Sequence, residues 1–212
     1  MENMNMLDFY IRVVKALDEI GAPYMIVGAF GGTIFGITRA THDIDIIVDL
    51  RETDFEPLSQ RFPLPRYYAD PEMIKNSVEM GIMFNIIDSS EGYKADLVPL
   101  KREPDYQMAF DRRIRETFTD ENDVPFEAWV AQPTDIIIGK LQAWNEGRSN
   151  KHPDDIFAIL FFCLRGYSNH QVNLEEVAKE AAHIGQETFD VWNKTLARAK
   201  NEIQKGDTPR KW

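Results

Sequence analysis

The sequence predicts an α/β (α+β) fold in which a small mixed β-sheet, flanked by helices, precedes a C-terminal helical bundle. Two observations support this. Up to about residue 130, short apolar runs rich in strand formers alternate with helical patterns. Beyond that point only helical patterns follow. We therefore expect two domains, residues 1–130 and 131–212.

The elements of the first domain begin with a helix over 6–20, where apolar residues recur at helical spacing until Gly21 ends the pattern. Two further helices are expected over 53–61 and 71–78. Strands are predicted over 24–27, 44–48, 82–87, 93–98, 112–118 and 124–130. The strands over 82–87 and 93–98 should form a hairpin, because a turn-rich segment joins them.

The second domain should consist of helices. Their predicted ranges are 133–146, 152–164, 173–184 and 187–203. Residues 156–164 are apolar all round, which is typical of a helix at the centre of a bundle.

Composition limits the possible functions. The 212 residues include 24 Lys and Arg against 35 Asp and Glu, a formal charge of −11, so no global positive field attracts nucleic acid. The single cysteine, Cys163, excludes an internal disulfide framework. No stretch has the apolar length of a signal peptide or of a membrane span of about 20 residues. We expect a cytoplasmic protein without membrane association.

Two acids stand in the strand that follows the first glycine-rich turn. Alternate strand residues face the same way, so Asp43 and Asp45 should project from one face, roughly 7 Å apart. At an effective dielectric near 20 they would repel by about 2 kcal/mol. A hard cation, Mg²⁺ or Mn²⁺, would turn that repulsion into ligation. The alternative is the solvated face of an edge strand.

The turn before these acids is unusually rich in glycine, at Gly28, Gly31, Gly32 and Gly36. Glycine allows the backbone to approach a ligand closely, and a turn that leads into a helix presents free N–H groups to phosphate oxygens. The alternative is a tight, closely packed strand-to-helix turn. Together, the turn and the paired acids favour a site for phosphate and metal.

This region resembles the nucleotidyltransferase superfamily with the DNA-polymerase-beta-like fold, and more narrowly the AbiEii-like and related minimal nucleotidyltransferases. The segments that carry the resemblance are Val27-Gly28-Ala29, Phe35-Gly36, Arg39-Ala40-Thr41 and Asp43-Ile44-Asp45. The sequence departs at Ala29, where the family usually has Gly or Ser. Backbone contacts to phosphate would survive that change, whereas a role that needs a serine hydroxyl would not.

The resemblance implies a nucleotidyltransferase fold with three metal-binding and catalytic acids, Asp43, Asp45 and Asp96. Asp96 lies in an Ala-Asp-Leu-Val segment, where the family places its third carboxylate on a neighbouring strand. Three such acids would hold two divalent ions about 4 Å apart beside the triphosphate. The alternative for Asp96 is a solvent-exposed acid at the end of a hairpin.

The resemblance also implies residues for nucleotide binding, namely Gly28, Ala29, Arg39, Thr41 and Lys140. Lys140 lies on the apolar stripe of its helix, so its ammonium must meet an anion or snorkel to water. In the family a lysine here contacts triphosphate. Asp155 matches a further family acid that would orient Lys140 or the acceptor, although acids are favoured in any first helical turn.

The resemblance thus predicts an enzyme that uses Mg²⁺ to transfer a nucleoside monophosphate from NTP to an acceptor hydroxyl, with release of pyrophosphate. The acceptor is a small molecule, a tRNA or a protein. One alternative is an AbiEii-like toxin component that modifies tRNA and has a cognate antitoxin. Another is a catalytically silent nucleotide-binding module that regulates a partner.

Overall fold

The computed structural model describes residues 5–102, 104–120 and 122–207. The chain divides into two compact units. The sheet unit comprises Met1–Phe30 and Ala40–Ala131, and the helical unit comprises Gly31–Arg39 and Gln132–Trp212. The segment Gly31–Arg39 therefore groups with the C-terminal helices, although the sequence-based boundary assigns it to residues 1–130.

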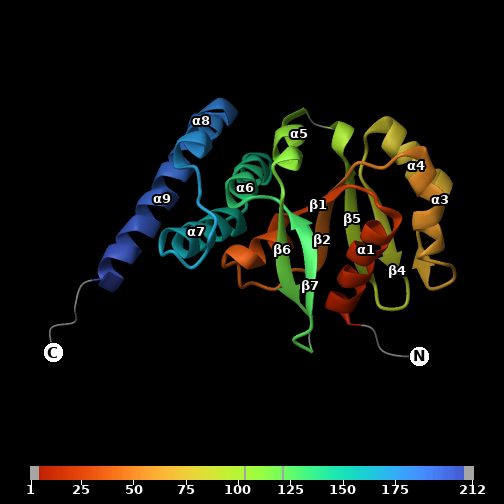
Figure 1. The fold of residues 1–212 in the computed structure, drawn as a ribbon. Coiled ribbons are helices and arrows are strands. Elements are labelled where there is room, and N and C mark those ends of the chain that lie inside the picture. Colours follow the sequence, from red (N-terminus) through yellow and green to blue (C-terminus); the bar gives the residue numbers. More distant parts are fainter. Residues whose placement is uncertain (1–4, 103, 121, 208–212) are drawn as a thin grey trace. The chain divides into compact units, whose positions relative to one another are not determined.

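Within the described residues, the sheet unit contains one mixed sheet of seven strands in the order β3-β4-β5-β2-β1-β7-β6 (Figure 1). The central strand β2 is antiparallel to β1 and parallel to β5, and β1 is parallel to β7. This confirms the predicted mixed sheet. The strands are β1 (Tyr24–Val27), β2 (Asp43–Val48), β3 (Tyr67–Tyr68), β4 (Phe84–Asp88), β5 (Tyr93–Pro99), β6 (Ile114–Thr119) and β7 (Pro125–Val130).

Helices flank this sheet. They are α1 (Met6–Ile20), the short α2 (Gly28–Gly31) after β1, α3 (Glu52–Gln60), α4 (Pro71–Met80) and α5 (Pro104–Asp111), with the 3-10 turn η2 (Leu100–Arg102) before α5. Helix α1 begins where the Asn5 side chain accepts a hydrogen bond from the backbone N–H of Asp8, and it ends at Gly21, as predicted.

Helix α1 packs on the apolar face of the sheet, beside β5 (Figure 1). The ring of Phe9 lies 6.3 Å from that of Tyr93, which shares its face of β5 with Ala95 and Leu97. Since successive strand residues alternate between faces, Lys94 and Asp96 project from the opposite face. The buried side chains of α1 include Phe9, Tyr10, Val13, Val14 and Leu17.

Several details of the sheet unit differ from the sequence-based prediction. The strand β3 was not predicted, because it has only two residues in a proline-rich segment and gains its pairing from β4. Helix α5 lacks a strong apolar stripe and was not predicted either. Strands β4 and β6 each begin two residues later than expected, at Phe84 and Ile114, and α4 ends two residues later, at Met80.

The helical unit contains η1 (Gly32–Phe35), α6 (Pro133–Gly147), α7 (Lys151–Leu164), α8 (Leu174–Ile184) and α9 (Gln186–Asp207). Helix α7 packs against α6, α9 and η1, while α6 packs against α7, α8, α9 and η1, so these two helices together form the centre of the bundle. The buried residues of α7 include Ile156, Ile159 and Leu160, and Trp192 of α9 is also fully buried. Among the described helices, none combines the length and the apolar character needed to cross a bilayer.

Candidate active site

Three acids share one face of the sheet. Asp43 and Asp45 are alternate residues of β2, and the parallel register with β5 sets Asp45 directly opposite Asp96. Directly opposed residues of neighbouring strands share a face. Asp43, Asp45 and Asp96, here called the carboxylate cluster, therefore project together from the face opposite α1.

The carboxylate of Asp45 lies against the backbone of Gly28, the first residue after β1. Gly28 has a φ of +69°, and a Cβ atom added there would overlap Asp45 Oδ2. The position thus requires glycine for its backbone conformation and for the close approach of a carboxylate. The next residue, Ala29, is 6% exposed, so its methyl group is buried.

Side chains from the same unit hold the other two acids. The Thr41 hydroxyl lies 2.9 Å from both the main-chain oxygen and Oδ1 of Asp43, and donates to one of them. Asn85 of β4 donates from Nδ2 to Asp96 Oδ1 at 2.5 Å. The ammonium of Lys94 lies 2.8 Å from Asp96 Oδ2. Each oxygen of Asp96 therefore has a partner.

The negative charges of the three acids shift the pKa values of neighbouring groups. The hydrogen bond to Asp96 raises the pKa of Lys94, and the charges of all three acids add to the shift. Burial raises the pKa of Tyr10, and the same three charges raise it further. Two different groups thus experience the charge of all three acids, which the strand register places on one face.

The donor set fits a hard divalent cation by its chemistry, since three carboxylates supply oxygen ligands from one face. One of them, Asp96, is however in contact with the ammonium of Lys94. Over the described ranges, no three Asp, Glu, His or Cys side chains are placed to hold one metal ion together. Metal binding by all three acids would require Asp96 to exchange its contact with Lys94 for the ion.

The other charged candidates belong to the helical unit. Arg39 donates from Nε and Nη2 to the two carboxylate oxygens of Asp155, at 2.8 and 2.9 Å. The ammonium of Lys140 lies 2.7 Å from Asp155 Oδ2. Lys140 is 5% exposed, so it does not snorkel to water but meets an internal anion. We call Arg39, Lys140 and Asp155 the buried ion-pair cluster, after the burial of Lys140 and Asp155; the side chain of Arg39 is 38% exposed.

Electrostatic interactions within this cluster favour the ionised form of Asp155. Burial raises the pKa of Asp155, but the hydrogen bonds from Arg39 and Lys140 outweigh burial and bring the pKa below its ordinary value. Burial lowers the pKa of the nearby His152, and the charge of Lys140 lowers it further. His152 therefore stays neutral at pH 7, and its buried Nδ1 has no hydrogen-bond partner among the described residues.

Two side chains of the candidate site were missed by the sequence-based prediction, Asn85 and Lys94. Asn85 is a polar residue in the otherwise apolar start of β4, as Asp96 is within β5. The hairpin register pairs the two directly. The polar residue Asn85 within an apolar strand was therefore the available signal in the sequence.

Two cavities of the sheet unit, of about 450 and 240 Å³, are lined by none of the candidate residues.

No family model matches the sequence, and no curated protein matches it. The structure is similar to that of an antigenic nucleotidyltransferase-like protein from Paracoccidioides brasiliensis, with a TM-score of 0.52, 13% identity and coverage of 91% of this chain and 92% of that chain.

Lower TM-scores are found for two other solved structures. A putative nucleotidyltransferase from H. pylori has a TM-score of 0.45, 13% identity and coverage of 98% of this chain and 99% of that chain. ANT(2")-Ia in complex with adenylyl-2"-tobramycin has a TM-score of 0.49, 15% identity and coverage of 84% of this chain and 95% of that chain. The likeness to the Paracoccidioides protein shows that the fold is a nucleotidyltransferase fold.

The contact between Gly28 and Asp45 predicts an unequal effect of two glycine substitutions. Gly92 also has a positive φ, +74°, but open space around its Cβ position. Gly92→Ala should therefore lose only about 1–2 kcal/mol of unfolding free energy, through backbone strain. Gly28→Ala should lose about 1–3 kcal/mol more, because the methyl group displaces the Asp45 carboxylate. Urea denaturation of both variants measures the difference, and equal losses would contradict the contact.

The buried ion-pair cluster predicts a pH-dependent loss of stability for Asp155→Asn. At pH 7 the variant should lose about 3–5 kcal/mol, because Lys140 is left as a buried charge without its counter-ion. The folded-state pKa of Asp155 is lowered. The stabilisation that the ionised Asp155 gives the folded protein is therefore complete above the pKa of an aspartate in the unfolded chain, near 3.9. It is lost as the pH falls through the pKa of Asp155 in the folded state.

Denaturation series at pH 7 and near pH 3 measure this loss, which should shrink at the lower pH. The matched control is Asp154→Asn, since Asp154 pairs with Arg198 at 3.0 Å on the exposed side of the same helix. The control should change stability by less than about 1 kcal/mol. The interpretation is wrong if both variants behave alike.

Proposed function

We propose that the chain is a nucleotidyltransferase that uses Mg²⁺ or Mn²⁺ to move a nucleoside monophosphate from an NTP to an acceptor hydroxyl. The observation that supports this most directly is the register of Asp45 opposite Asp96, with Asp43 on the same face, within a nucleotidyltransferase fold. The acceptor is a small molecule, a tRNA or a protein.

In this proposal Asp43, Asp45 and Asp96 would hold the divalent ion. The bound ion would stabilise the leaving pyrophosphate and lower the pKa of the acceptor hydroxyl. Asn85 fixes the carboxylate of Asp96 before substrate binds, and the Thr41 hydroxyl lies within hydrogen-bond distance of the carboxylate of Asp43.

The reaction would form a bond between the acceptor oxygen and the α-phosphorus and break the bond from that phosphorus to the bridging oxygen of pyrophosphate. A carboxylate, for which Asp96 is our candidate, would accept the proton of the hydroxyl. The backbone at Gly28 and Ala29 would lie beside phosphate oxygens, a role that needs no side-chain hydroxyl. Contacts of Arg39, Thr41 and Lys140 with the nucleotide stay predictions.

Incubation with each α-labelled NTP, Mg²⁺ and separate pools of tRNA, protein and metabolites tests the proposal. The wild-type protein should transfer label to one pool and release pyrophosphate. Asp45→Asn should reduce the rate by at least about 100-fold, because it removes a charge at the metal and the reacting phosphate.

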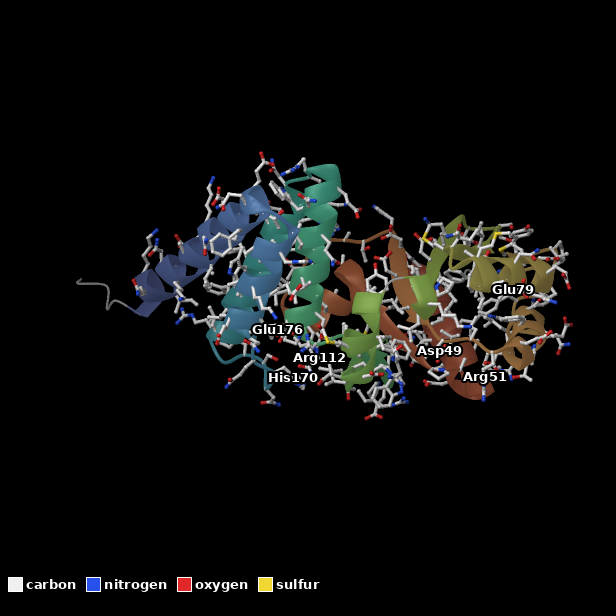
Figure 2. The ribbon with its side chains drawn as sticks, turned by 90° about the horizontal axis from the view of Figure 1, so that it is seen from above. Asp49, Arg51, Glu79, Arg112, His170 and Glu176 are labelled. Atoms are coloured by element: carbon white, nitrogen blue, oxygen red, sulfur yellow. The ribbon has the colours of Figure 1, made fainter. Side chains whose placement is uncertain are left out.

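The control is Asp49→Asn. Asp49 is an exposed acid in the segment between β2 and α3 (Figure 2), outside the carboxylate cluster, and its loss should leave the rate unchanged. Equal rates for Asp45→Asn and wild type would refute the catalytic role of the acids. If the protein binds nucleotide but transfers label to none of the pools with any NTP, the result would favour a catalytically silent regulatory module.

A further inference from the structure

Lys94 occupies a distinctive place in the carboxylate cluster. It lies two residues before Asp96 on β5, so both side chains project from the same face. The register also sets Lys94 directly opposite Asp43 on β2. Its ammonium lies 2.8 Å from Asp96 Oδ2. A single cation thus stands in direct contact with one acid and across the strand pair from another.

The contact with Lys94 occupies an oxygen that a metal ion would need. Asn85 takes Oδ1 of Asp96 and Lys94 takes Oδ2, so neither oxygen is without a partner. The three carboxylates repel one another, and a positive charge among them relieves that repulsion. Lys94 and a divalent ion would therefore compete for the same negative charge.

The exposure of Lys94 allows that exchange. Its side chain is 41% exposed, whereas that of Asp96 is 9% exposed. The lysine can therefore move its ammonium into water at little cost, while the acid stays fixed on the strand with its amide partner.

We propose that Lys94 is the resident counter-ion of the carboxylate cluster and leaves Asp96 when a divalent cation binds, so that Lys94 sets the cation concentration at which the site fills. This inference rests on the proposed metal-dependent function. It assigns Lys94 a positioning role, because the lysine acts on the site through Asp96. Removal of the ammonium should tighten cation binding, whereas removal of an acid should weaken it.

Binding of Mn²⁺ alone, followed by the electron paramagnetic resonance of the free ion, tests this with the full chain and no nucleotide. Lys94→Met should bind Mn²⁺ at least about threefold more tightly than wild type, because the ion no longer has to displace the Lys94 ammonium. A change of that size corresponds to the loss of one partly exposed ion pair. Lys94→Arg keeps the charge and should retain the wild-type affinity. Lys75→Met removes a lysine of α4, outside the cluster, and should also leave the affinity unchanged.

Thermal unfolding provides a second readout. Without Mn²⁺, Lys94→Met should unfold at a lower temperature than wild type, because the carboxylates lose their counter-ion. Saturating Mn²⁺ should raise its unfolding temperature by more than it raises that of wild type. A merely structural lysine would produce the first effect without the second.

The outcomes separate this inference from the proposed function. In one outcome, wild type binds Mn²⁺ saturably, Asp45→Asn weakens that binding, and Lys94→Met leaves it unchanged or weaker. This outcome would overturn the role of Lys94 and leave the metal site standing. Absence of saturable Mn²⁺ binding in wild type and in Lys94→Met alike would overturn both. Tighter binding by Lys75→Met and Lys94→Met to the same degree would show an effect of net charge and overturn the inference.

Discussion

The parallel pairing of β2 with β5 is the constraint on which the candidate site depends. Parallel strands need a crossover, and here the chain between Val48 and Tyr93 supplies it with α3, α4 and β4. A slip of one residue would turn Asp96 to the apolar face and bring Ala95 or Leu97 to the other. Both apolar residues are fully buried. Burial of the core therefore fixes the register that sets Asp45 opposite Asp96.

Much of the sheet unit could be predicted from local pattern. The alternation of Asp43 and Asp45 within β2 gave their common face, and the apolar runs on either side of the turn gave the hairpin of β4 and β5. The position of Asp96 beside Asp45 could not be worked out locally, because it depends on a register between strands about 50 residues apart, so it came from the family resemblance. That prediction of position agrees with the register.

The remaining features differ in how far local pattern could have predicted them. Lys94 reads as an ordinary surface lysine until the register sets it opposite Asp43. Asn85 was within reach, because counting outward from the hairpin turn pairs it with Asp96. The contact of Lys140 with Asp155 joins two helices. The apolar stripe of α6 indicated only that the lysine needs an anion or water, and it was the family resemblance that named Asp155 as an acid that would orient Lys140 or the acceptor. The grouping of Gly31–Arg39 with the helices depends on tertiary contacts alone.

The pairs Lys140–Asp155 and Lys94–Asp96 show how burial decides what an ion pair can do. Lys140 and Asp155 are both nearly inaccessible to water, at 7% and 3% of their side-chain areas, and separation would leave an uncompensated buried charge that costs about 3–5 kcal/mol. Lys94 reaches solvent, so water can hydrate its ammonium after separation from Asp96, and an incoming cation can replace it beside the buried carboxylate. The same chemical pair is therefore a fixed structural contact in the helical unit. In the sheet unit it is a contact that an incoming cation can exchange, because only there does the lysine have water to move into.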